Sequence, residues 1–320
     1  MSGLMTARTS FKPFDYPWAF EYYQDSEAMH WLAKEVKLHD DVKQWKQVLT
    51  DQEKNLLTQL FRFFTQADCD VSSGYVERYL PRFSKPELRL MLLSFANREA
   101  VHIEAYSQLI ETLGLPESEY SAFTEYEAMS EKHEYMMASN DGSLRSLAKD
   151  MAIFSAFGEG LQLFSSFAVL FSFSLRGLMP GMTEIVKWSI KDESLHVSGM
   201  IKLFTQLMHE NPELWDDAFK RELYQVRRDM VDLEDKFIDL MFEMGDLPNI
   251  SAEETKKFIR YLADHRGNQL GIKPEYNIPE NPFPWVDEMM ALTHANFFER
   301  RSTEYAKGQL EGETSSDDFM

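Results

Sequence analysis

Two histidines each follow a glutamate at a spacing of three, as Glu99/His102 and Glu193/His196, and these pairs are the residues best suited to chemistry. On a helix, this spacing places both side chains on the same face. Carboxylate oxygens and imidazole nitrogens together suit ions such as iron or manganese. The two pairs therefore predict a metal site in a helical protein.

The spacing alone is a weak signal, because the chain is rich in acidic residues. With 53 Asp and Glu among 320 residues and eight histidines, about one such pair is expected by chance. Glu27/His30 is interpreted as a pair of this kind, exposed to solvent. The two other pairs differ because they adjoin the apolar stretches "LMLLSFAN" and "VKWSIK".

A third acidic residue, Asp68, is about as far from a predicted helix–helix turn at Ser84 as Glu99 of the first pair is. Going back 16 residues from Ser84 reaches Asp68, and going forward 15 reaches Glu99. At a rise of 1.5 Å per residue, each arm of an antiparallel hairpin is then roughly 23 Å long. Asp68 should face Glu99, with Asp70 as the alternative.

A fourth acidic residue, Glu159, is the only charged residue in the apolar stretch 151–175. It lies 18 residues before Gly177, and Glu193 lies 13 residues after Pro180. In a hairpin that turns at 177–180, the two residues are therefore less evenly placed about the turn than Asp68 and Glu99 are. A buried acid needs a charge partner. Four carboxylates and two imidazoles around one cavity suit a pair of metal ions, as in di-iron carboxylate helix bundles.

The elements that must position these residues are predicted to be helices, and no stretch has the repeated alternation typical of strands. Thr50 with Glu53 forms a capping box, and Pro86 and Gly114 mark the two ends of another helix. Residues 1–300 are predicted to form a single all-α domain and 301–320 a flexible tail. The predicted helices cover 51–80, 84–114, 117–138, 144–176, 182–208, 213–244 and 252–269.

Composition limits the class of function. The net charge of −20 argues against nucleic acid as a partner. The single cysteine, Cys69, excludes an intrachain disulfide and fits a reducing cytoplasm, and no signal-peptide core is found. The apolar stretch 151–175 is long enough to cross a membrane, but Glu159 and several serines favour a buried core helix over a membrane span.

With these residues, the sequence resembles the small, radical-generating subunit of class I ribonucleotide reductase, a ribonucleoside-diphosphate reductase. The resemblance extends from about Trp31 to the C-terminus. It implies a ferritin-like helical bundle with extra helices, and two iron ions per chain, with manganese or a mixed manganese–iron pair as alternatives. The metal ligands that it implies are Asp68, Glu99, His102, Glu159, Glu193 and His196.

Tyr106 lies one turn beyond His102, so its phenol should face the metal site. The resemblance implies that Tyr106 is oxidised to a radical after the di-metal centre is activated by dioxygen. Ser189 departs from the family's pattern, because an apolar residue is expected near the radical. The polarity around Tyr106 is therefore open.

The resemblance also implies a route for the radical. It assigns Trp31 and Asp192 to the start of this route and Glu299 and Tyr305 to its far end. The oxidising equivalent would reach a cysteine of a separate large subunit, which converts ribonucleotides to deoxyribonucleotides. A homodimer is implied as well, and the acidic tail ending in "DDFM" is expected to dock on the large subunit.

Two other functions share the predicted ligands. A ferritin-like di-iron oxidase acting on its own small substrate would not need Tyr305. An iron-storage bundle would be shorter and would not need Trp31 beside the site. No glycine loop of the phosphate-binding type is found, so nucleotides are expected to bind to the large subunit.

Overall fold

The computed structural model describes residues 3–138 and 141–290, which divide between two units, Met1–Pro282 and Phe283–Met320. In the described part of the first unit, the structure is helical and contains no strand beyond one isolated bridge between Leu247 and Ile250. The all-α prediction is therefore confirmed. In the second unit, 283–290 are described, so the predicted boundary at residue 300 and the tail 301–320 lie outside the described residues.

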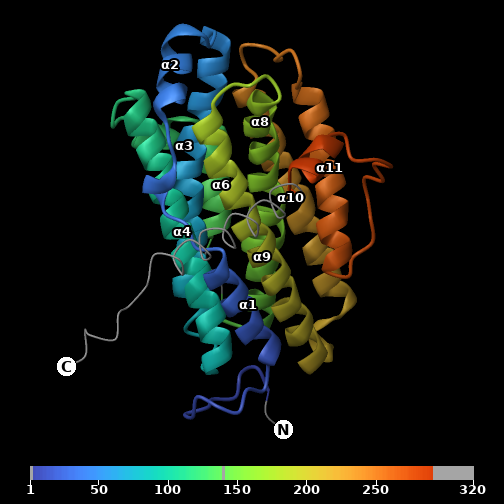
Figure 1. The fold of residues 1–320 in the computed structure, drawn as a ribbon. Coiled ribbons are helices and arrows are strands. Elements are labelled where there is room, and N and C mark those ends of the chain that lie inside the picture. The colour runs from blue at the N-terminus through green and yellow to red at the C-terminus, as the bar shows by residue number, and fades with distance from the viewer. Residues whose placement is uncertain (1–2, 139–140, 291–320) are drawn as a thin grey trace, which may run out of the picture. The chain divides into compact units, whose positions relative to one another are not determined.

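The described part of the first unit is built of helices (Figure 1). Most are α-helices, and 3-10 and π-helical segments lie between them. The α-helices are α1 (Pro17–Ala28), α2 (His39–Gln47), α3 (Asp51–Ser73), α4 (Pro86–Leu113), α5 (Glu119–Ala122), α6 (Glu127–Met137), α7 (Leu144–Asp150), α8 (Phe164–Ser174), α9 (Pro180–Glu210), α10 (Asp217–Met241) and α11 (Ala252–Gln269). The 3-10 segments are η1 (Ala33–Glu35), η3 (Phe123–Glu125) and η5 (Pro212–Leu214), and the π-helical segments are η2 (Gly74–Tyr79) and η4 (Met151–Leu163).

Helices α3 and α4 form the first predicted hairpin and pack against each other. The Thr50 hydroxyl accepts a hydrogen bond from the backbone N–H of Glu53, and the Glu53 carboxylate accepts one from the backbone N–H of Thr50, so the capping box is confirmed. Pro86 begins α4 and Gly114 ends it with a φ of 80°. The N-cap of α4 is Lys85, one residue later than the expected Ser84.

The second hairpin pairs the continuous helix 144–174 (α7, η4 and α8) with α9. Residues Leu144–Ser174 are long and apolar enough to cross a membrane, yet the most apolar window is entirely buried within the fold. This agrees with the expected core helix. The N-terminus of α9 is held by Asp41 of α2, whose carboxylate accepts from the backbone N–H groups of Gly181 and Met182, each at 2.8 Å.

Two parts of the fold differ from the sequence prediction. Helices α1 and α2 were not among the predicted helices, and α1 buries little beyond Ala19 and Ser26, which leaves almost no apolar periodicity to read. The predicted helix 117–138 is interrupted at Tyr126, whose extended backbone separates η3 from α6.

Candidate metal centre

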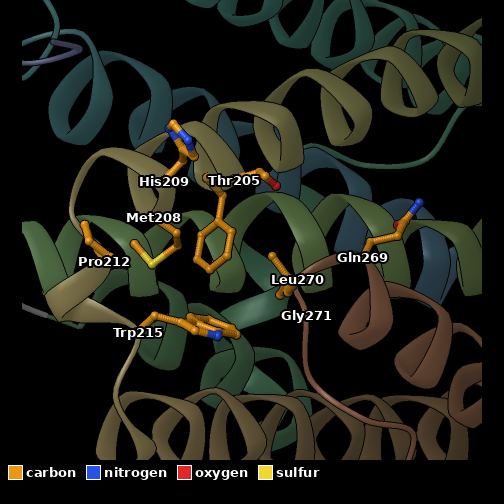
Figure 2. A pocket seen from close by; sticks show the side chains of 9 residues that line it. Thr205, Met208, His209, Pro212, Trp215, Gln269, Leu270 and Gly271 are labelled. Carbon is orange, nitrogen blue, oxygen red and sulfur yellow. The ribbon is translucent and has the colours of Figure 1, made fainter.

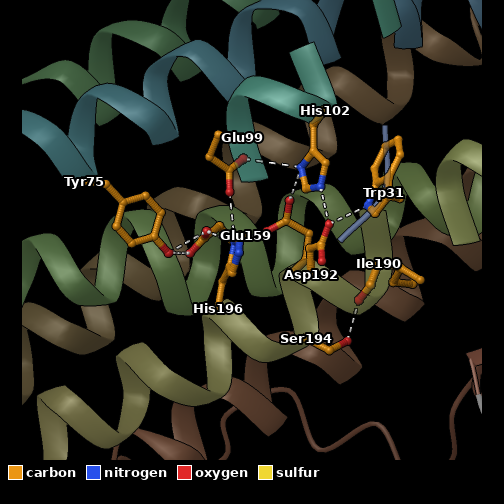
Figure 3. A network of polar contacts seen from close by, with 10 residues as sticks. Trp31, Tyr75, Glu99, His102, Glu159, Ile190, Asp192, Ser194 and His196 are labelled. Atoms are coloured by element: carbon orange, nitrogen blue, oxygen red, sulfur yellow. Dashed lines mark hydrogen bonds and ion pairs between the residues drawn. The ribbon is translucent and has the colours of Figure 1, made fainter. Parts of the chain in front are cut away.

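Four of the predicted ligands converge between α4, η4 and α9. Glu99, Glu159, Glu193 and His196 each offer a ligand atom, and these atoms lie within 4.8 Å of one another. All four side chains are completely buried. Figure 3 shows that Glu99, Glu159 and His196 point toward one another from three separate helical segments.

His102 joins this group through the two glutamates that carry the Glu-x-x-His patterns. Its Nδ1 lies 3.1 Å from Glu193 Oε1 and 3.6 Å from Glu99 Oε2. His196 Nδ1 lies 2.9 Å from Glu99 Oε1, 3.4 Å from Glu193 Oε2 and 3.3 Å from Glu159 Oε1. Glu99 and Glu193 therefore each face both histidines, whereas Glu159 contacts His196 alone.

Asp68 and Asp70 have different surroundings. Asp68 is 1% exposed, and its Oδ2 has no hydrogen-bond partner among the described residues. Burial raises its pKa well above the ordinary value; His102 opposes this, and nearby glutamates such as Glu99 add to it. The Asp70 carboxylate instead contacts His133 at 2.7 Å and accepts from Gln66 at 2.6 Å. The charges of the cluster therefore act on Asp68, whereas the Asp70 carboxylate is bonded to His133 and Gln66.

The cluster fits a pair of divalent ions by its donor set and by its unpaired atoms. In the described part of the chain, no oxygen of Glu99 or Glu193 has a hydrogen-bond partner, and neither does Nε2 of His196. The close contacts of these oxygens are ion pairs with the two histidines, and buried polar atoms are ordinarily hydrogen-bonded, so this concentration of acceptors suits a bound cation. Four carboxylates would balance the charge of two divalent ions.

The charges of the cluster shift the pKa values of its members. Burial alone would lower the pKa of both histidines, but the surrounding carboxylates raise each well above its ordinary value. The pKa of Glu159 is raised by burial and by Glu193, against the opposing effects of His196 and Tyr75. The metal-free cluster thus holds protons where a bound cation would displace them.

Tyr106 lies next to this cluster on α4 and is 1% exposed. Its ring stacks on Phe64 at 4.4 Å between centroids, with 14° between the planes. Burial and the charges of Asp68 and Glu193 raise its pKa well above 10, while the hydroxyl of Ser189 lowers it in part. The Tyr106 and Ser189 oxygens nevertheless form no hydrogen bond of normal geometry. Ser189 therefore does bring a polar group near Tyr106.

A chain of contacts leads from the cluster to Trp31, which is 2% exposed. His102 Nε2 lies 3.0 Å from Asp192 Oδ2, and the same oxygen accepts a hydrogen bond from Trp31 Nε1 at 2.9 Å (Figure 3). The Trp31 and His102 rings also stack at 5.8 Å. Trp188, which sequence reasoning missed, lies 5.1 Å from Trp31 and is half-buried.

Sequence reasoning also missed Tyr75, whose hydroxyl donates to Glu159. A signal was present in the spacing, because Tyr75 follows Asp68 by seven residues and so lies on the same helix face two turns later. The expected helix 51–80 includes residues 74–79, but these form the π-helical segment η2 rather than a continuation of the α-helix. Single π-helical turns are frequent at functional sites.

The remaining predicted residues are placed away from the cluster or are not described. Glu27 and His30 are both exposed, as expected of a solvated pair. Glu299 and Tyr305 lie outside the described residues.

A separate pocket of about 450 Å³ lies between the C-terminal ends of α9 and α11 (Figure 2). Its lining is mainly apolar and includes Phe204, Met208 and Trp215. His209 is the only titratable residue among those that line it, and none of the cluster residues does so. The carboxylates and histidines predicted to bind metal therefore lie in the buried cluster and not in this pocket.

A helical bundle around a buried cluster of carboxylates and histidines defines the ferritin-like class of metal-binding proteins. Residues 8–282 match the family described as ribonucleotide reductase, small chain. A probable ribonucleoside-diphosphate reductase small subunit of Invertebrate iridescent virus 3 is 43% identical over 329 residues, covering 97% of this chain and 87% of the relative. The chain belongs to the ribonucleotide reductase small-chain family, and the enzyme class expected from the sequence is confirmed.

Solved structures support the fold. The ribonucleotide reductase R2 subunit from Clostridium botulinum has a TM-score of 0.83 at 21% identity, covering 90% of this chain and 94% of that one. A Streptococcus sanguinis protein solved in a dimanganese(II) form has a TM-score of 0.71 at 20% identity, covering 89% and 99%. The ferritin-like fold prediction is therefore confirmed.

Proposed function

We propose that this chain generates and stores a radical for a class I ribonucleotide reductase. The single observation that carries the proposal is the buried cluster of carboxylates and histidines, beside which lie a buried tyrosine and a contact chain to Trp31. The residues that would hold two metal ions are Asp68, Glu99, His102, Glu159, Glu193 and His196. Iron is the proposed metal, with manganese or a mixed pair as alternatives, because oxygen-rich sites with imidazole accept both.

When two such ions are bound and exposed to dioxygen, they supply one-electron oxidising power. Tyr106 is the proposed electron donor, since its ring is buried beside Asp68 and Glu193. The raised pKa keeps its phenol protonated until oxidation, so it must lose a proton together with an electron. Burial against Phe64 shields the resulting radical from water and external reductants.

The proposed route out of the site begins at Asp192 and Trp31. Asp192 Oδ2 contacts both His102 and the Trp31 indole, so electron transfer across this side can be coupled to movement of a proton between them. Glu299 and Tyr305 are proposed to continue the route to a cysteine of a separate large subunit, where ribonucleotides are reduced. The chain is proposed to act as a homodimer in the cytoplasm.

A ferritin-like oxidase acting on its own small substrate would use the same ligands. The contact chain from His102 through Asp192 to a buried tryptophan favours radical transfer, because such an oxidase has no need to conduct electrons outward. Turnover that depends on the large subunit would separate the two functions.

The test is to count metal ions and record an electron paramagnetic resonance spectrum after aerobic loading with ferrous iron. About two ions per chain and a tyrosyl signal are expected. Tyr106→Phe should retain the metal ions and lose the signal, because only a hydroxyl beside the site is removed. Retention of full metal binding by Glu159→Ala, or persistence of the tyrosyl signal in Tyr106→Phe, would contradict the assignment.

A further inference from the structure

We propose that Tyr75 is a positioning residue that fixes the orientation of the Glu159 carboxylate for metal binding. The proposal rests on the proposed function in one respect, namely that Glu159 is a metal ligand. It assigns a role in the same site to a residue on a segment that contributes none of the six proposed ligands.

The hydrogen-bond geometry shows how Tyr75 restrains Glu159. The phenolic oxygen lies 2.8 Å from Glu159 Oε1 and 3.1 Å from Oε2, so its single proton is shared between the two carboxylate oxygens (Figure 3). Both side chains are 1% exposed or less. Within the described part of the chain, the other polar contact of the Glu159 carboxylate is His196, at 3.3 Å. Rotation of the carboxylate therefore stretches a charge-assisted hydrogen bond on one side.

The geometry makes Tyr75 the donor and Glu159 the acceptor, because the Tyr75 hydroxyl lies within hydrogen-bond distance of both oxygens of the Glu159 carboxylate. A neutral donor on a ligand carboxylate leaves the remaining oxygen lone pairs available to a cation. Such supporting hydrogen bonds orient ligands, and their loss typically weakens metal binding 10- to 100-fold.

The fold holds the Tyr75 ring in place from several directions. The ring lies edge-on to Phe95 and to His196, each at 6.0 Å between centroids. The neighbouring Gly74 allows η2 to approach Phe154 of η4, because a Cβ at this position would lie 2.8 Å from the Phe154 ring. Close packing of the two π-helical segments thus brings the phenol within reach of Glu159.

Tyr79 provides a matched control in the same π-helical segment. It is also fully buried, and its hydroxyl donates to the backbone carbonyl of Asp150 at 3.0 Å. Tyr79 and Tyr75 are in edge-on contact at 5.7 Å. Replacing either tyrosine by phenylalanine removes one buried hydroxyl of η2, but only Tyr75 bonds to a proposed ligand.

The experiment measures Mn²⁺ binding to the full-length chain by chelator competition, together with the spectrum of the bound Mn²⁺ by electron paramagnetic resonance. Tyr75→Phe should weaken binding about 10- to 100-fold and change the spectrum. Tyr79→Phe should bind Mn²⁺ as the unaltered chain does, while losing a similar amount of thermal stability. Equal binding by the unaltered chain and Tyr75→Phe, or equal weakening by both tyrosine variants, would overturn the positioning role.

A double-mutant cycle with Glu159→Gln separates positioning from general loosening of the fold. If Tyr75 acts through the Glu159 carboxylate, Tyr75→Phe should have a much smaller effect on Mn²⁺ affinity when Gln occupies position 159. An undiminished effect in that background would overturn the proposal even if Tyr75→Phe is poorly folded. An unaltered chain that binds no metal would refute the proposed function, whereas normal metal binding without the Tyr75 effect refutes the positioning role alone.

Discussion

Two of the groups of buried charges in the helical unit differ in their electrostatic character. In the first, Lys132 of α6 pairs with Glu234 of α10 at 2.6 Å, and Ser165 donates to the other Glu234 oxygen at 2.5 Å. The Lys132 ammonium also lies over the rings of Phe63 and Phe237, at 3.7 and 4.4 Å. This group has one charge of each sign, and both oxygens of its carboxylate have partners.

The second group, the candidate metal centre, has a surplus of acids and leaves several carboxylate oxygens without hydrogen bonds in the described part of the chain. Burying a charge is costly unless it is paired, and the surrounding helices provide no lysine or arginine that contacts Glu99 or Glu193. The difference teaches that burial alone does not identify a site. The surplus of acids does, because no lysine or arginine among the described residues is paired with Glu99 or Glu193, and such a surplus suits a bound cation.

The largest difference between the two groups should appear when metal is added. With free Mn²⁺ at 1,000 times the dissociation constant, each occupied site should raise the free energy of unfolding by about 4 kcal/mol. Glu159→Ala should lose most of this gain, because one acid of the cluster is missing. Urea denaturation with metal and with a chelator measures the gain.

Two controls define what this measurement means. Glu27→Ala alters the exposed Glu27/His30 pair and should keep the full gain from metal. Conservative changes at the Lys132–Glu234 pair should also keep it, because that pair contributes no ligand. A metal-induced gain that survives in Glu159→Ala would show that the ions bind elsewhere.

Breaking the Lys132–Glu234 ion pair should have the next largest effect on the free energy of unfolding. Lys132→Met leaves the Glu234 carboxylate buried without its counter-charge, and such a change typically costs about 3–5 kcal/mol in the free energy of unfolding. The double variant Lys132→Met, Glu234→Met should recover much of the loss, since a well-packed apolar pair can replace a buried ion pair. Urea denaturation of the metal-free proteins measures both, and a single variant as stable as the unaltered chain would contradict the interpretation.

The pH dependence of the metal-free protein should reveal the surplus of acids. The pKa values of His102 and His196 are raised in the folded state, so their stabilising effect is complete below about pH 6.5 and is lost as the pH rises. The pKa values of Asp68 and Glu159 are also raised, so the folded chain binds more protons than the unfolded chain above about pH 4. Both effects lower the free energy of unfolding as the pH increases.

Urea denaturation in chelator between pH 5.5 and 8 tests this slope. His196→Gln should flatten it, because one titrating partner is removed. Bound metal should reverse the trend, since ligands must release their protons to bind a cation. A slope that is the same in His196→Gln as in the unaltered chain would assign the pH dependence to other groups.

Much of this arrangement could be predicted from sequence because caps and charges leave local signals. Thr50 with Glu53 and the pair Pro86 and Gly114 mark helix ends by their own backbone requirements. A carboxylate in an apolar stretch, as at Glu159, needs a partner wherever the helix lies. These features allowed the hairpins, and thus the convergence of the acids, to be inferred.

The π-helical segments could not be predicted, because they result from packing between helices and leave no change in apolar periodicity. In the second hairpin, the sequence places Glu159 about a turn farther from the connection at 177–180 than Glu193. Residues 159–163 of this arm belong to η4, and its i to i+5 hydrogen bonds take up an extra residue per turn, which accounts for part of the difference. The same segment brings Glu159 opposite His196, and η2 brings Tyr75 to Glu159.

The smallest effect on the free energy of unfolding is expected for an ion pair that is partly exposed to solvent. Arg260 of α11 binds Asp235 of α10 through two parallel contacts of 2.9 and 2.6 Å, with side chains 29% and 21% exposed. Solvent screens this pair, so Asp235→Asn should lower the free energy of unfolding by about 1 kcal/mol or less. The loss should shrink further in 1 M salt, whereas the loss in Lys132→Met should persist because the Debye screening of buried groups is weak. Urea denaturation with and without salt measures both losses. If Asp235→Asn and Lys132→Met were equally sensitive to salt, the proposed difference between exposed and buried ion pairs would be wrong.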